Sequence, residues 1–133
     1  MSTLSDSLES PTIAISNARQ LDWSAYRKRA LSAGRDYLEA VEGILDGVRS
    51  RRAQSEAEGR VSDATVEDMI GTGLFRAFTP LRYGGLEMDP ASFFEGIMKI
   101  AAADASAAWV AGQLNVHGFE IALMSERMQD EFW

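Results

Sequence analysis

Apolar residues recur every three or four positions through the first half of the chain, which predicts a long amphipathic helix beginning near Asp22. The positions that share this apolar face are Trp23, Tyr26, Ala30, Ala33, Tyr37, Val41, Ile44 and Val48. Gly59 is the predicted end of the helix, because glycine readily adopts the left-handed conformation that closes helices. Arg49, Arg51 and Arg52 suit the negative end of the helix dipole, and we interpret them as a solvated helix end rather than an anion-binding site.

A short second helix is predicted to begin at Ser62 or Asp63, since either side chain can accept a hydrogen bond from the first turn. The residues expected to point inward from it are Val66, Met69 and Ile70. The helix ends at the Gly–Thr–Gly of residues 71–73. This is not a dinucleotide-binding fingerprint, because Arg76 stands where the third glycine would fall and no strand precedes it. The two glycines after Tyr83 then predict a tight turn.

Asp89 and Pro90 predict the start of a third helix, since aspartate is a good cap and proline suits the first helical position. We expect this helix to be central, because apolar residues surround much of it: Phe93, Phe94, Ile97, Met98, Ile100 and Ala101. A fourth helix is predicted from its cap, Ser106, through Leu123, and a fifth from Ser125. No alternating strand pattern occurs, so the sequence predicts an all-α bundle of about five helices.

Trp109, Gln113 and His117 recur every four residues along the fourth helix. Each step of four residues drifts by about 40° around a helix, so the three side chains share one stripe. The expected packing face is the neighbouring stripe of Val110, Leu114 and Ile121. An indole, an amide and an imidazole on one face suit an aromatic ligand. The small residues of the helix would let a neighbouring element or a flat ligand come close: Ala105, Ala107, Ala108, Ala111, Gly112 and Gly118. Spacing alone leaves open a packed tryptophan and an ordinary exposed histidine.

Composition excludes several classes of function. The chain has 133 residues, no cysteine, one histidine and a net charge of -7. It therefore cannot build disulfides, iron–sulfur clusters, thiolate zinc sites or a multi-histidine metal site of its own. The negative charge argues against nucleic acid and anionic membrane surfaces as partners. Residues 1–20 are polar and lack the features of a secretory signal, so we expect a disordered leader, a helical domain over residues 21–133 and a cytoplasmic location.

Several short motifs occur in a recognisable order in the second half of the chain: Pro80 with Tyr83–Gly84–Gly85, Asp89–Pro90 with Phe93–Phe94, Ala103–Asp104–Ala105–Ser106 before Trp109, Val116–His117, and the closing Gln129–Asp130–Glu131–Phe132–Trp133. Through them residues 25–133 resemble the N-terminal domain of the acyl-CoA dehydrogenase fold. Within that superfamily the chain is most similar to flavin-dependent monooxygenases that hydroxylate phenols, such as 4-hydroxyphenylacetate and phenolic secosteroid hydroxylases. The turn is shared across the superfamily and is only moderately specific, whereas the pair of Trp109 and His117 is much more specific to the hydroxylase branch.

The resemblance implies the oxygenase component of a two-component monooxygenase. Such enzymes take reduced flavin, FMN or FAD, from a separate reductase and use oxygen to hydroxylate an aromatic substrate through a flavin C4a-hydroperoxide. It also implies that His117 is catalytic, reaching the substrate phenol and helping to form the phenolate. Trp109 would lie beside flavin and substrate, and Gln113 would line the pocket. Tyr83 is carried as a further flavin- or substrate-binding residue, although its glycine neighbours favour a structural role in the turn.

Members of this family are several times longer than this chain. Their β-domain and C-terminal helical bundle supply most flavin contacts and the interface of a homotetramer. Because the sequence stops at Phe132–Trp133, we expect a truncated domain that carries one wall of the site and is inactive alone. We expect its first and third helices to expose apolar surface. Two other interpretations stay open: an acyl-CoA dehydrogenase-type flavoprotein, and a non-catalytic helical interaction module.

Overall fold

The computed structural model describes residues 22–133, and the predicted leader of residues 1–20 lies outside this range. Within the described residues all regular elements are helical and no strand occurs. In chain order they are α1 (Trp23–Glu58), α2 (Asp63–Gly71), η1 (Leu74–Arg76), η2 (Leu81–Tyr83), α3 (Pro90–Ala103), α4 (Ala105–Ala122) and α5 (Glu126–Phe132), where η marks a short 3₁₀ helix. The prediction of an all-α bundle of about five helices is confirmed. None of these helices is both long and apolar enough to cross a membrane.

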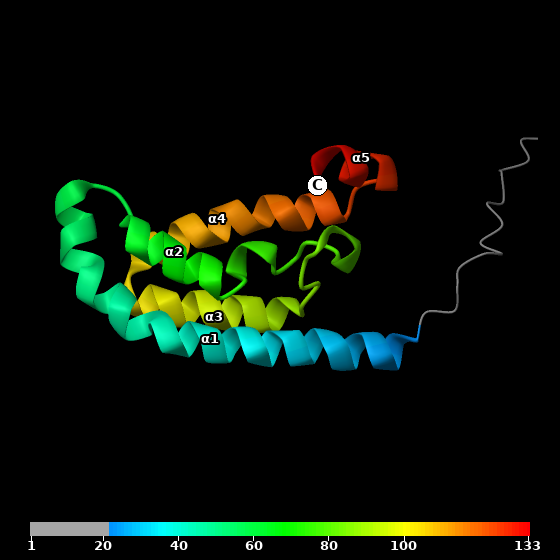
Figure 1. The fold of residues 1–133 in the computed structure, drawn as a ribbon, viewed down its shortest axis with the longest axis horizontal. Coiled ribbons are helices and arrows are strands. Elements are labelled where there is room, and N and C mark those ends of the chain that lie inside the picture. Colours follow the sequence, from blue (N-terminus) through cyan, green and yellow to red (C-terminus); the bar gives the residue numbers. More distant parts are fainter. Residues whose placement is uncertain (1–21) are drawn as a thin grey trace, which may run out of the picture.

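Helix α3 is central, as its apolar residues predict. It lies along the long helix α1 on one side and packs against α4 on the other, while α2 contacts both α1 and α4, and η1 contacts α2 and α4 (Figure 1). The core between these helices is made of buried side chains from all of them: Tyr37, Val41, Met69, Leu74, Ala77, Met88, Phe93, Ile100, Ala107, Ala108 and Ala111. Helix α5 folds back beside the end of α4, on the side of α4 that faces away from α3 and α1 (Figure 1).

Most helix ends lie where the sequence predicts them. The Asp22 carboxylate accepts hydrogen bonds from the first turn of α1, and Gly59 closes that helix in the left-handed conformation. Ser62 caps α2, and Asp89 caps α3 with proline in its first turn. The predicted cap of α4, Ser106, is wrong. The cap is Asp104, whose Oδ1 accepts from the backbone amides of residues 106 and 107, because the helix begins one residue before the serine.

The predicted packing face of α4 is also wrong. Val110 and Leu114 are exposed and Ile121 is half-buried. The buried positions of the helix are instead the small residues and one amide: Ala107, Ala108, Ala111 and Asn115. Small side chains let α4 approach α3 closely, so of the two expected uses of these residues the structure shows contact with a neighbouring helix. The larger apolar residues are therefore left at the surface.

Two other expected inward positions are exposed. Trp23 begins the predicted apolar face of α1, yet its side chain is 68% exposed and Tyr26 beside it is also exposed. The reason is visible in the ribbon, where the first turns of α1 extend beyond the start of α3 (Figure 1). Ile70 points away from the core at the end of α2, whereas Met69 is fully buried. The helical period of apolar residues thus identifies which face of a helix is apolar, but it does not show how much of that face a neighbouring helix covers.

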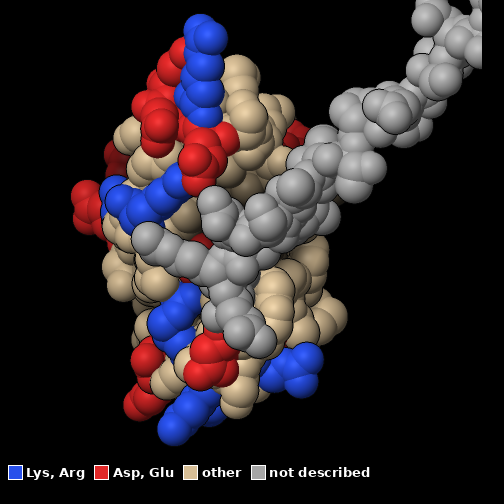
Figure 2. All heavy atoms as spheres, turned by 90° about the vertical axis from the view of Figure 1, so that its right-hand side faces the viewer, with Lys and Arg blue, Asp and Glu red and all other residues tan. Residues whose placement is uncertain are grey.

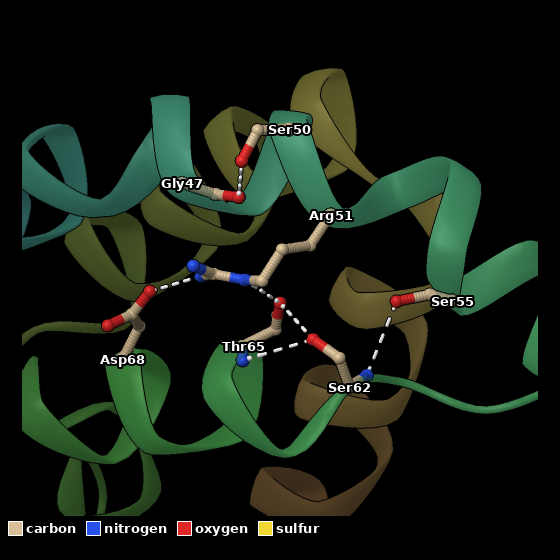
Figure 3. A network of polar contacts seen from close by, with 7 residues as sticks. All are labelled: Gly47, Ser50, Arg51, Ser55, Ser62, Thr65 and Asp68. Atoms are coloured by element: carbon tan, nitrogen blue, oxygen red, sulfur yellow. Dashed lines mark hydrogen bonds and ion pairs between the residues drawn. The ribbon is translucent and has the colours of Figure 1, made fainter.

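Arg51 does not belong to a solvated helix end. Its guanidinium forms an ion pair with Asp68 and donates from Nε to Thr65 Oγ1 at 3.0 Å, which joins α1 to α2 (Figure 3). Ser62 Oγ donates to the same threonine oxygen at 3.0 Å, and its backbone amide donates to Ser55 Oγ. Because a carboxylate already neutralises this guanidinium, the geometry favours a helix-to-helix bridge over an anion-binding site.

The buried hydroxyl of Tyr37 gives a pH-dependent prediction. The side chain is 2% exposed, its Oη donates to the carbonyl oxygen of Phe93 at 3.5 Å, and burial raises the pKa of Tyr37 above its ordinary value. The unfolded chain therefore loses this proton first, so stability should hold below about pH 10 and fall above it, by up to about 1.4 kcal/mol per pH unit. Urea unfolding of the wild type and of Tyr37→Phe, at several pH values on either side of about pH 10, measures this change in the free energy of unfolding. The free energy of unfolding of the variant should fall less steeply with pH above about pH 10. An equally steep fall in both proteins would contradict the role assigned to Tyr37.

Candidate functional site

A groove of about 520 Å³ lies between α3 and α4. Its lining residues are Phe78, Pro90, Phe93, Phe94, Ile97, Ala101, Ala105, Ala108, Trp109, Gly112, Gln113, Val116 and Phe119. None of these residues carries a charge, and their polar side-chain groups are the amide of Gln113 and the indole N–H of Trp109. The volume falls within the range usual for small-molecule sites, which are mostly apolar with a few placed polar groups. The groove therefore suits a flat, apolar molecule with one polar edge.

Trp109 and Gln113 lie together on this groove, as the sequence predicts for two residues one turn apart. The Trp109 side chain is 70% exposed, so its ring face is available to stack on a ligand. Gln113 is also exposed, and its amide can both donate and accept a hydrogen bond. These two side chains give α4 a stacking surface and a polar group on the same wall.

His117 lies outside that groove. It lines a smaller hollow of about 110 Å³ between α4 and the end of α5, together with Gly118 and Trp133. The further turn of about 40° between positions 113 and 117 carries the imidazole away from α3. Its side chain is 68% exposed, and its Nδ1 is 3.2 Å from Oε2 of Glu120. The predicted stripe thus spans two adjoining hollows, with Trp109 and Gln113 on one and His117 on the other.

Tyr83 lies in η2 and lines neither hollow. Its hydroxyl donates to the carboxylate of Asp130, and its ring centroid is 6.2 Å from that of Trp133. Partial burial raises the pKa of Tyr83, and the hydrogen bond to Asp130 raises it further by a smaller amount. Next to it, Arg82 donates to Oε1 of Glu126 at 3.0 Å and to Oε1 of Gln129 at 2.9 Å. These contacts support the structural interpretation of Tyr83, and its binding role stays a prediction.

The amide of Gln129 completes this link between η2 and α5. The side chain is buried, and its Nε2 donates to the carbonyl oxygens of Ala122 at 3.0 Å and Met124 at 2.8 Å. Ala122 is the last residue of α4, so its carbonyl has no partner within that helix, and Met124 lies just after the helix. The Gln129 side chain therefore caps α4 through its Nε2 and accepts a hydrogen bond from Arg82 through its Oε1. These contacts hold α5 beside the hollow that His117 lines.

The glycines after Tyr83 are required by the backbone. Gly84 has φ 74°, a conformation that other residues rarely adopt. Gly85 is buried so close to Thr79 that an added Cβ would overlap the backbone carbonyl of that residue. The shared turn motif is thus explained by local geometry.

The sequence did not identify the aromatic wall of the groove. Phe78 precedes η2, and its ring centroid lies 4.6 Å from that of Phe93 and 5.2 Å from that of Phe119. Phe119 was within reach of sequence reasoning, since positions 105, 109, 112, 116 and 119 continue one helical face. Phe78 was not, because only the tertiary fold brings it to α4.

Charged side chains of both signs are visible on the face of the bundle that Figure 2 shows. In that view acidic and basic residues lie beside one another, with uncharged surface between them (Figure 2). Several of the contacts of α5 are ion pairs, including Arg82 with Glu126 and Arg127 with Glu131. The net charge of the chain is therefore not concentrated on this visible face.

No protein-family model matches the chain. It is 35% identical over 96 residues to the flavin-dependent monooxygenase oxygenase subunit HsaA of Mycobacterium tuberculosis, and the match covers 72% of this chain and 24% of that protein. It is 37% identical over 101 residues to the oxygenase component of p-hydroxyphenylacetate 3-hydroxylase of Acinetobacter baumannii, covering 76% and 24%. It is 33% identical over 93 residues to the oxygenase component of the FADH(2)-dependent resorcinol hydroxylase of a Rhizobium species, covering 70% and 23%.

A solved structure is similar as well. The crystal structure of 3-HSA hydroxylase from Rhodococcus sp. RHA1 has a TM-score of 0.68 and 31% sequence identity, and the match covers 74% of this chain and 25% of that one. The chain thus spans about a quarter of the length of the relatives that it matches. It is a homologue of part of the oxygenase components of flavin-dependent aromatic monooxygenases, and it shares the helical fold of the matching segment.

Proposed function

We propose that this chain forms one wall of the site in the oxygenase component of a two-component monooxygenase that hydroxylates a phenolic substrate. The observation that carries the proposal is the uncharged groove in which Trp109 and Gln113 lie side by side on α4. The names of its relatives, which are monooxygenases and hydroxylases, favour this function over an acyl-CoA dehydrogenase-type flavoprotein and over a non-catalytic module.

The groove fits the aromatic part of a flavin or of a substrate. Trp109 offers a ring face and Gln113 an amide, which suit a planar ring with polar edge atoms. The lining contains no lysine or arginine that could pair with a flavin phosphate. We therefore infer that this groove contacts rings only, and that the flavin phosphate is bound outside the groove.

Reduced flavin, FMN or FAD, would come from a separate reductase and supply the electrons that activate molecular oxygen. In this scheme the residues of α4 hold the substrate and move its proton. Trp109 and Gln113 orient the ring, and His117 accepts the proton of the phenol, which makes the ring carbon next to it nucleophilic. The matching relatives are named oxygenase subunits or components, which supports a reductase partner. A homotetramer of the full-length protein is part of the same proposal.

Filling the groove tests the proposal on the chain itself. A Cβ at Gly112 would meet no atom within 4 Å, so Gly112→Leu should project into the groove without disturbing the bundle. Titration with 4-hydroxyphenylacetate or 2-naphthol, followed by tryptophan fluorescence, should show quenching in the wild type. The variant should bind at least about tenfold more weakly, which corresponds to the loss of about 1.4 kcal/mol.

Two further variants make the titration interpretable. Gly43→Leu on α1 also places its Cβ in open space, so it matches the substitution without touching the groove. Trp109→Phe removes the fluorophore on the groove and should abolish most of the quenching, since Trp23 and Trp133 do not line it. Equal affinity in Gly112→Leu and the wild type would show that the ligand binds elsewhere.

A further inference from the structure

His117 has a carboxylate neighbour one turn along α4. Its Nδ1 lies 3.2 Å from Oε2 of Glu120, and both side chains are at the surface, 68% and 58% exposed. An ionised carboxylate only accepts hydrogen bonds, so the imidazole must provide the proton. The proton in this contact therefore belongs to Nδ1.

The contact determines which nitrogen of the neutral ring is basic. A neutral imidazole carries one proton, so a ring that is protonated at Nδ1 has its lone pair at Nε2. The contact with Glu120 engages Nδ1 alone and leaves Nε2 to face other partners. The hollow of about 110 Å³ beside the ring adjoins the larger groove, because Phe78 lines both, so His117 lies next to the position proposed for the substrate ring.

We propose that Glu120 is a positioning residue that biases His117 toward the Nδ1–H tautomer, so that Nε2 is the atom that takes the phenol proton. In this step the phenol O–H bond breaks and the Nε2–H bond forms, which leaves a phenolate and an imidazolium. The imidazolium is stabilised by Glu120 and later releases its proton to water. The identity of the proton donor rests on the proposed function, whereas the tautomer is a property of this chain alone.

The expected effect is moderate because both groups are exposed. Interactions of exposed charged pairs change an equilibrium by about two- to fivefold, since solvent screens them. Glu120 should therefore raise the ratio of the Nδ1–H to the Nε2–H tautomer by about two- to fivefold over that of an imidazole without a carboxylate neighbour.

Nuclear magnetic resonance can measure this ratio directly, because the chain has one histidine. The untagged, ¹⁵N-labelled 133-residue chain is compared with three variants at a pH at which the imidazole is neutral, using two-bond ¹H–¹⁵N correlations of the ring. Glu120→Ala should lower the Nδ1–H to Nε2–H ratio by about two- to fivefold. Glu120→Gln keeps an acceptor oxygen and should restore part of it. Glu67→Ala removes an exposed carboxylate from α2 and should leave the ratio at its wild-type value.

An unchanged tautomer ratio in Glu120→Ala would overturn the proposal whatever the activity of the protein. The functional arm uses the full translated protein with its reductase. There Glu120→Ala should lower kcat for hydroxylation about two- to fivefold with little change in KM, and Glu120→Gln should recover part of it. If every variant including the wild type lacks hydroxylation, the proposed function fails while the tautomer result still stands. A shifted tautomer with unchanged kcat would overturn the role of Glu120 in the reaction.

Discussion

Replacing Gly96 with alanine should destabilise the bundle by about 3 kcal/mol, because α1 and α3 touch at this position. An added Cβ would lie well under 3.0 Å from the hydroxyl and ring of Tyr37, a separation that real Cβ atoms essentially never show. Tyr37 is fully buried between the two helices, so its ring has no room to withdraw. The better helix propensity of alanine offsets only about 1 kcal/mol of this loss.

Urea unfolding followed by far-ultraviolet circular dichroism measures the effect. Gly43→Ala is the matched control, since it lies on α1 with no atom within 4 Å of an added Cβ. That variant should be more stable than the wild type by about 0.5–1 kcal/mol, because it gains propensity without a clash. If Gly96→Ala were as stable as Gly43→Ala, the close contact between α1 and α3 would be disproved.

Replacing His117 with alanine should lower the rate of hydroxylation by about 100-fold or more in the full translated protein. General acid–base residues typically contribute factors of this size, and the chain has no second histidine that could take over the role of His117. Oxygen consumption should continue, with the oxygen released as hydrogen peroxide instead of entering the ring. Product chromatography and a peroxide assay, with reductase, flavin and a phenol present, separate the two outcomes.

His117→Gln distinguishes proton transfer from simple binding. The amide keeps a hydrogen-bonding group but cannot take a proton, so this variant should bind the phenol and still fail to hydroxylate it. Both variants should unfold at nearly the wild-type urea concentration, since the side chain they replace is mostly exposed. Hydroxylation at the wild-type rate in either variant would contradict the assigned role of His117.

Helix positions were predictable because their signals are local. Asp22, Gly59 and Asp89 act on the backbone within a few residues of themselves, so the sequence alone locates the ends of α1 and the start of α3. The packing face of α4 was not predictable in this way. Whether Val110 or Ala107 faces α3 depends on how closely two helix axes approach, which is decided by residues on both helices.

The candidate site was predictable only in part for the same reason. Trp109 and Gln113 share a groove because they share a helix face, and spacing shows this. The opposite wall, with Phe94, and the end formed by Phe78 come from other segments of the chain. The hollow beside His117 likewise depends on where α5 lies, because Phe132 and Trp133 line it, and a single helix does not reveal this.

The glycine contacts between α1 and α3 also bear on how such a site can change during evolution. Gly34 faces Ser92 and Asp89 about as closely as Gly96 faces Tyr37, so α1 and α3 touch at two points. Helix α3 therefore has little room to move toward α1 and away from the groove. A groove with one immobile wall adapts to a new ligand mainly through the other wall. Diversification of substrate range is therefore expected to concentrate at the groove-facing positions of α4, such as Gly112, Val116 and Phe119, while the α1–α3 seam stays constant.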